Sequence, residues 1–194
     1  MRSEICKIRE KAMGRTISIG NQSFESIRNY NNFYIDKTGF IKEWWENDDS
    51  VTLITRPRRF GKTLNMSMLE CFFSIKYANK NDMFDGLEIW KEEKYRNIQG
   101  TFPVIFVTFA GVKGNNYISA IKGIKQQIIS VCDSFSFLLD WDGITESEKK
   151  LFNRTMNDIS DDEAAYSLLI LSGLLERYHK KRVLQSINLA GLLV

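Results

Sequence analysis

The stretch whose residue types and spacing best suit phosphate chemistry is the loop at residues 56–63, Arg-Pro-Arg-Arg-Phe-Gly-Lys-Thr. A glycine lets the backbone come close to a phosphate oxygen, and the first N–H groups of a following helix point at the anion. Lys62 would then reach the β- and γ-phosphates of a nucleoside triphosphate, and the Thr63 hydroxyl would ligate Mg²⁺. The loop therefore predicts a nucleotide-binding site.

The match to the general phosphate-loop pattern is incomplete. That pattern has a glycine five residues before Gly61, where this chain has Arg56. Gly-Lys followed by Ser or Thr also occurs by chance in about one chain of this size in ten. The alternative interpretation is an ordinary strand-to-helix turn that carries a few solvated arginines. The apolar run before the loop and the helical pattern after it favour nucleotide binding.

The elements that would position this loop follow from the residue pattern. β-Branched and aromatic residues predict strands at 51–55 and 102–109, and Val183-Leu184 resembles the start of a third. Helical periodicity is expected at 40–45, from Lys62 to about Tyr77, from Asn116 to about Cys132, at 146–156, and from Asp161 or Asp162 to about Tyr178. Strands alternating with helices predict an α/β fold with a mainly parallel sheet flanked by helices.

The composition, with 43% apolar and 26% charged residues, is ordinary for a globular protein, and the net charge of +3 gives little support to a nucleic-acid binder. Cys6, Cys71 and Cys132 form no C-x-x-C pair, which argues against a zinc site or disulfide framework. The single histidine, His179, lies in a basic run typical of a solvated helix end. No stretch reaches the roughly 18 apolar residues of a membrane span, and residues 1–11 lack a secretory pattern. We therefore expect a cytoplasmic protein with no membrane partner.

Several motifs together resemble the AAA-ATPase-like family of anaerobic bacteria, whose members often carry a PD-(D/E)XK nuclease-like domain behind the ATPase. The matching segments are 18–20 (Ser-Ile-Gly) with Phe24, 34–38 (Tyr-Ile-Asp-Lys-Thr), the loop with its flanks at 53–64, 84–87 (Phe-Asp-Gly-Leu) and 103–105 (Pro-Val-Ile). In that family an arginine at the position of Arg56 is usual. The resemblance implies a P-loop NTPase fold with ATP and Mg²⁺. It also implies a nucleotide site formed by Arg56, Arg58, Arg59, Phe60, Gly61, Lys62, Thr63 and Leu64, with Thr63 on the metal.

Asp36 and Lys37 lie about two dozen residues before the loop, where related ATPases often place a segment near the base or ribose. The resemblance therefore implies that both serve the nucleotide site. The alternative is that Asp36 caps the helix that follows it.

The resemblance ends near Leu184. Similar proteins continue into an apolar strand that closes with an acidic Walker B pair, whereas residues 185–194 contain no Asp or Glu. We therefore expect an N-terminal extension at 1–13, the ATPase-like domain at 14–184 and an aberrant or truncated tail at 185–194. The sheet would be incomplete, with an exposed edge that favours self-association and with poor ATP hydrolysis. Asp140 could substitute for the missing acid only if residues 135–140 form a strand, and a loop or helix end is the preferred interpretation.

Two other functions compete with an ATP-binding domain. The basic residues between Arg56 and Lys62, interleaved with Phe60, also suit a nucleic-acid-binding module. The loss of pattern after Leu184 also fits a non-functional gene remnant, which is compatible with a domain that still binds ATP.

Overall fold

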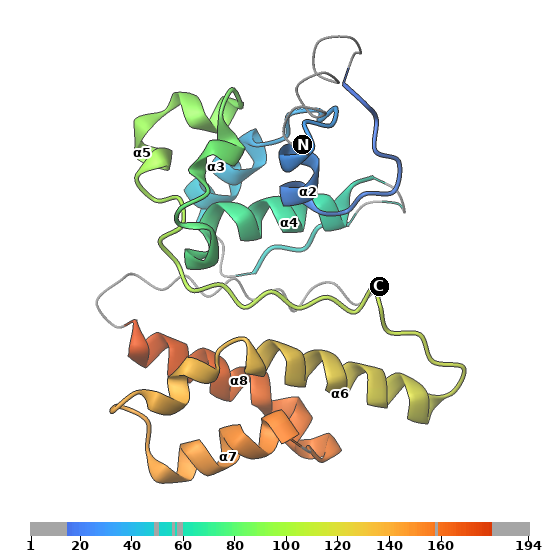
Figure 1. Ribbon diagram of the computed structural model, residues 1–194, viewed down its shortest axis with the longest axis vertical. Helices are drawn as coiled ribbons and strands as arrows, with labels where there is room; N and C mark the ends of the chain where they lie inside the picture. The colour runs from blue at the N-terminus through green and yellow to red at the C-terminus, as the bar shows by residue number, and fades with distance from the viewer. Residues whose placement is uncertain (1–14, 49–50, 56, 58–59, 158, 180–194) are drawn as a thin grey trace, which may run out of the picture. The chain divides into compact units, whose positions relative to one another are not determined.

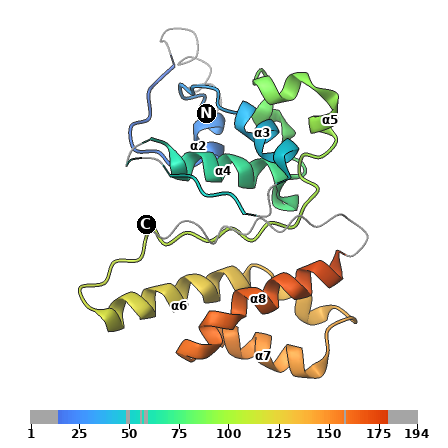
Figure 2. The same cartoon turned by 180° about the vertical axis from the view of Figure 1, so that it is seen from behind.

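The computed structural model describes residues 15–48, 51–55, 57, 60–157 and 159–179. The chain divides into two compact units, Met1–Thr101 and Phe102–Val194 (Figures 1 and 2). All the described residues of the predicted phosphate loop belong to the first unit.

The first unit is built from short helices around an aromatic core. The helices are α2 (Phe24–Asn29), α3 (Gly39–Asn47), α4 (Lys62–Phe73) and α5 (Glu93–Arg96), with 3₁₀ helices η1 (Ile75–Tyr77), η2 (Asn81–Phe84) and η3 (Glu88–Lys91). The Phe84 ring lies 5.2 Å from the rings of Phe24 and Phe72, measured between centroids. These rings join α2, α4 and η2, and such aromatic pairs stabilise a core beyond their buried area. The core therefore holds α4 in place behind the loop.

The second unit consists of three long helices that contact one another: α6 (Tyr117–Asp133), α7 (Glu146–Asn157) and α8 (Asp161–Tyr178). Cys132, Phe152, Leu171 and Leu174 are almost fully buried between them, together with Leu138 from η4 (Ser136–Asp140). All three helices lie where the sequence predicts them. Residues 136–140, expected as a loop or helix end, form the 3₁₀ helix η4 and not a strand.

The predicted parallel sheet is wrong for the part of the chain that the structure describes, which contains no β-strand. Residues 51–55 and 103–109 run without regular structure, and Val51 and Leu53 leave 62% and 59% of their surface exposed. No backbone hydrogen bond joins residues 51–55 to another described residue. β-Branched residues favour an extended backbone, but a strand requires hydrogen bonds to a neighbouring strand. The third expected strand, residues 183–184, lies outside the described residues.

Two helix boundaries also differ from the sequence prediction. The helix after the loop ends at Phe73 and not near Tyr77, because Ser74 is extended (φ −71°, ψ 132°) and separates α4 from η1. Helix α8 is capped by Ser160 and not by Asp161 or Asp162, because the Ser160 hydroxyl accepts a hydrogen bond from the Glu163 amide at 3.2 Å.

Candidate functional site

Helix α4 begins at the predicted loop with a backbone that has no side-chain cap. Gly61 is its N-cap residue, with φ 76° and ψ 19°, in the left-handed region that glycine adopts without steric strain. The first helical hydrogen bond of α4 joins the Asn65 amide to the Gly61 carbonyl at 2.9 Å, and the first turn contains no acidic residue. The amides before Asn65 therefore have no helical partner and can bind an anion.

The described loop residues are accessible to a ligand. The Phe60 side chain is 58% exposed, and Lys62, Thr63 and Leu64 are each partly buried. The Thr63 hydroxyl makes no hydrogen bond to another described residue, so its oxygen is available to ligate a metal ion. Arg56, Arg58 and Arg59 lie outside the described residues.

The Lys37 ammonium group lies beside the N-terminus of α4. A Cβ atom placed on Gly61 would be 3.7 Å from Lys37 Nζ. Lys37 is exposed, and two dozen residues separate it from Gly61 in sequence. The structure thus brings together Lys37, Gly61 and the first turn of α4.

Asp36 lies next to Lys37 but uses its carboxylate within the fold. Its Oδ1 accepts hydrogen bonds from the Thr38 amide at 2.8 Å and the Thr38 hydroxyl at 2.7 Å, and its Oδ2 accepts from the Glu88 amide at 2.7 Å. Partial burial raises the pKa of Asp36, but the hydrogen bonds from Thr38 and Glu88 and the nearby Arg28 outweigh it, so the pKa is lowered. Asp36 therefore stays ionised and anchors the start of α3.

The residues on either side of Asp36 and Lys37 tie this segment to the rest of the first unit. The Tyr34 hydroxyl donates to Met68 Sδ on α4 at 3.2 Å, and burial raises the pKa of Tyr34 to about 12. Thr38 is fully buried, and its hydroxyl accepts from the Ile89 amide at 3.2 Å. Lys37 therefore extends from a short segment that is held at both ends.

Comparison with known proteins identifies the family. Residues 18–184 match the AAA-ATPase-like family, described as predicted AAA-ATPases. The chain belongs to the AAA-ATPase-like family. A protein of Azotobacter chroococcum mcd 1, named as an uncharacterized protein in the vnfD 5′ region, is 33% identical over 98 residues. That match covers 50% of this chain and 17% of the relative's length, and no solved structure matches.

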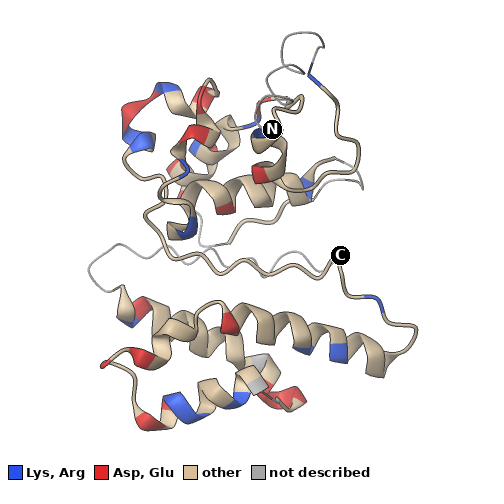
Figure 3. Cartoon of the chain, in the orientation of Figure 1, with Lys and Arg blue, Asp and Glu red and all other residues tan. Residues whose placement is uncertain are grey.

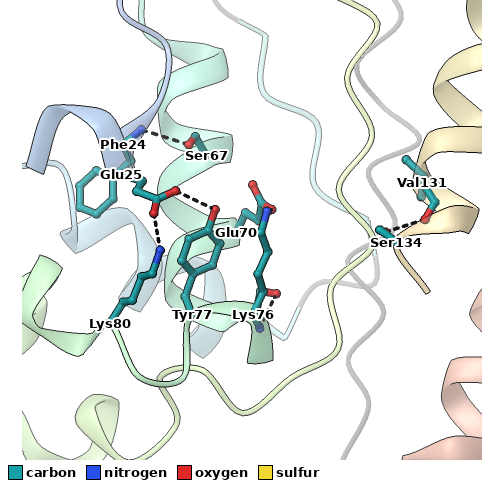
Figure 4. Close-up of polar contacts among 10 residues, drawn as sticks. Phe24, Glu25, Ser67, Glu70, Lys76, Tyr77, Lys80, Val131 and Ser134 are labelled. Carbon is teal, nitrogen blue, oxygen red and sulfur yellow. Dashed lines mark hydrogen bonds and ion pairs between the residues drawn. The ribbon is translucent and has the colours of Figure 1, made fainter. Parts of the chain in front are cut away.

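In this AAA-ATPase-like chain a polar cluster that the sequence analysis missed joins α2 to α4 and to the segment that follows α4 (Figure 4). The Ser67 hydroxyl accepts from the Phe24 amide at 3.1 Å. Glu25 accepts from Lys80 at 2.5 Å and from the Tyr77 hydroxyl at 3.3 Å. In the sequence, only the three-residue spacing of Ser67 and Glu70 hints at this polar face, because their partners come from other segments.

Glu70 belongs to the same face of α4 and is paired with Lys76 at 3.4 Å. Burial raises the pKa of Glu70, and Lys76 only partly opposes this. Neither Glu70 nor Glu25 gathers with other metal-ligating side chains, since the described residues contain no group of three or more His, Cys, Asp and Glu that could hold a metal ion.

The cysteines, Asp140 and His179 lie apart from the predicted loop in sequence. Cys71 and Cys132 are free and fully buried, as expected for small apolar residues, and Cys6 is not described. Asp140 closes η4, and His179 is the C-cap residue of α8, with its Nε2 atom buried. No helix in the described ranges has the length and apolar character needed to cross a bilayer.

Proposed function

We propose that this chain binds ATP together with Mg²⁺ at the N-terminus of α4. The main-chain amides from Gly61 to Leu64 contact phosphate, Lys62 contacts the β- and γ-phosphates, and the Thr63 hydroxyl ligates Mg²⁺. Of Arg58 and Arg59, one faces the nucleotide, because a guanidinium group can bind a phosphate through two parallel hydrogen bonds.

One observation carries this proposal: in a family of predicted ATPases, α4 starts at a left-handed glycine with uncapped amides. A side-chain cap or an acidic residue in the first turn would compete with a phosphate for the same amides. Neither is present at α4, and the adjoining residues are Lys62 and Thr63. The residues at this position therefore fit a polyphosphate.

Isothermal titration of the whole chain with a non-hydrolysable ATP analogue and Mg²⁺ tests the proposal. Lys62→Ala should weaken binding by about 10- to 100-fold, since hydrogen bonds to a charged group contribute about 1.5–3 kcal/mol. Lys122→Ala on α6 is the matched control, because it removes the same positive charge from an exposed lysine of the second unit. Equal affinity of the wild type and Lys62→Ala would refute the proposed site.

The same proposal includes slow hydrolysis by this 194-residue chain. Phosphoryl transfer depends on charges that order Mg²⁺ and the attacking water. Lys62 and Thr63 supply part of this arrangement, but residues 185–194, where the resemblance places the acidic pair, include no Asp or Glu. Phosphate release should therefore differ little between the wild type and Lys62→Ala. Robust turnover that depends on Lys62 would mean that another acid takes this role.

Nucleic-acid binding is the second candidate because Phe60, in the basic loop, is more than half exposed. An exposed aromatic ring beside arginines can stack on a base of a single strand. Salt-sensitive binding of an oligonucleotide that ATP does not displace, and that Phe60→Ala removes, would favour this function over nucleotide binding.

A further inference from the structure

We propose that Lys37 is a second phosphate-binding lysine, and that Asp36 positions Lys37 without contacting the nucleotide itself. This inference rests on the proposed ATP binding and deepens it. It moves Lys37 from the base or ribose, where its sequence position would place it, to the polyphosphate. It also separates the roles of two adjacent residues.

The Lys37 ammonium group lies close to the residue that begins α4. A Gly61 Cβ would lie 3.7 Å from Lys37 Nζ, so the charge is within contact distance of the residue that begins α4. A phosphate bound to the first amides of α4 would lie between this charge and the helix N-terminus. Two unit charges about 4 Å apart interact strongly even when partly solvated.

Lys37 has no acidic partner among the residues that the structure describes. Acidic and basic residues are interspersed along the helices of the first unit (Figure 3). Lys42, Lys80 and Lys94 pair with carboxylates at 2.5–2.8 Å. Neither Lys37 nor Lys62 is paired with a carboxylate among the described residues. The two lysines next to the N-terminus of α4 are therefore available for an anionic ligand.

The Asp36 carboxylate is occupied by hydrogen bonds within the fold. Each of its carboxylate oxygens accepts at least one hydrogen bond from the fold, from Thr38 and from Glu88. A carboxylate beside a polyphosphate would repel it, whereas a carboxylate that folds the chain back through Thr38 fixes the direction of the next residue. Asp36 thus acts on the ligand only through Lys37.

The chemistry predicts which ligands should depend on Lys37. An ammonium group acts as a point charge on phosphate oxygens and does not read a base or sugar. ATP, ADP and inorganic tripolyphosphate should all be sensitive to loss of Lys37, while AMP should be almost insensitive. A lysine on the base or ribose would give the opposite result, with AMP affected and tripolyphosphate unaffected.

The test is titration of the whole chain, with Mg²⁺, against a non-hydrolysable ATP analogue, ADP, AMP and tripolyphosphate. We expect Lys37→Gln to weaken the ATP analogue and tripolyphosphate about tenfold, equivalent to about 1.4 kcal/mol. Lys37→Arg should restore most of this affinity, since it keeps the charge. Lys122→Gln on α6 removes the same charge and should change neither affinity.

A double-mutant cycle separates the roles of Asp36 and Lys37. Asp36→Ala should weaken ATP-analogue binding in the wild type but not in Lys37→Gln. In Lys37→Gln the contact between Lys37 and phosphate, through which Asp36 acts, is already lost. Asp36→Ala should also lower the unfolding midpoint, whereas Lys37→Gln should leave it unchanged. Additive losses would show that Asp36 acts on the ligand independently and would overturn its positioning role.

Each remaining outcome counts against the inference. Wild-type affinity of Lys37→Gln for tripolyphosphate, while Lys62→Ala still weakens binding, would overturn the role of Lys37 and leave the proposed function intact. An equal loss in Lys122→Gln would reduce the effect to net charge. A wild-type chain with no affinity for the ATP analogue would overturn both the proposed function and this inference.

Discussion

Helices α4 and α8 begin in opposite ways, although they belong to the same chain. At α8 the Ser160 hydroxyl accepts from the Glu163 amide, the Glu163 carboxylate accepts from the Ser160 amide at 2.9 Å, and the first turn contains three acidic residues. At α4 the N-cap is Gly61, and the first turn has neither a cap nor an acid. Helix α8 satisfies its own N-terminal amides and dipole, and α4 does not.

The other long helices of the second unit resemble α8 and not α4. Helix α6 starts with a reciprocal capping box between Asn116 and Ser119, and α7 starts with the same arrangement between Thr145 and Glu148. A positive lysine at the start of α4 is unfavourable for the helix alone and favourable for a bound anion. A ligand that binds only the folded state would compensate by stabilising it. The long helices of the second unit thus cap their own starts, whereas α4 leaves its first amides without a side-chain cap, as the proposed ATP site requires.

The largest expected effect comes from giving α4 an acid like those of α8. Gly61→Asp places a carboxylate at the uncapped amides and within reach of Lys37, so it should repel a polyphosphate and lower ATP affinity by about 100-fold or more. Gly61→Asn is the matched control, because both residues tolerate a left-handed backbone and differ by one charge. Titration should show a much smaller loss for Asn. Equal losses would mean that shape, and not charge, controls this position.

The next largest effect is expected on stability, at the start of α8. Ser160→Ala removes the α8 cap and should lower the free energy of unfolding by about 1 kcal/mol. ATP affinity should not change. Ser172→Ala, inside the same helix, should be neutral or slightly stabilising, because alanine favours a helix interior. Denaturant titration measures both variants, and an unchanged midpoint for Ser160→Ala would show that the capping box contributes nothing.

The contrast between the two helix starts also shows what the sequence could predict. Periodicity located α6, α7 and α8, because their apolar stripes depend on nearby residues. The predicted cap of α8 is wrong, since Ser160 and Asp161 are both good capping residues and only the hydrogen bond distinguishes them. The predicted strands failed because β-branched composition describes one segment, whereas a sheet requires the partner segments as well.

The residues of the proposed site divide in the same way. The sequence alone predicted Gly61, Lys62 and Thr63, because a phosphate loop is a contiguous motif. Lys37 was implicated only through resemblance, and its place beside Gly61 depends on the long-range bond from Glu88 to Asp36. No local pattern encodes a contact between segments so far apart along the chain.

A smaller effect separates the carboxylates of the two helices by the sign of their pH dependence. Burial raises the pKa of Glu70 on α4, so the folded protein holds that proton more tightly than the unfolded chain does. Stability is then lost as pH rises from the usual glutamate pKa through the raised one. Glu70→Gln, which is neutral, should therefore be more stable than the wild type at neutral pH. Thermal unfolding across the acidic range should show this advantage disappearing as pH falls.

Glu163 on α8 should show the opposite sign and the smallest effect. Hydrogen bonds from the Ser160 amide and hydroxyl lower the pKa of Glu163, and Arg154 forms an ion pair with it. Its contribution to stability is therefore present above the usual glutamate pKa and is lost as pH falls through the lowered one. Glu163→Gln can still close the capping box but carries no charge, so it should be less stable than the wild type at neutral pH and converge with it in acid. A stability difference between Glu163→Gln and the wild type that stays constant across that pH range would show that the shape of the side chain, and not its charge, stabilises the start of α8.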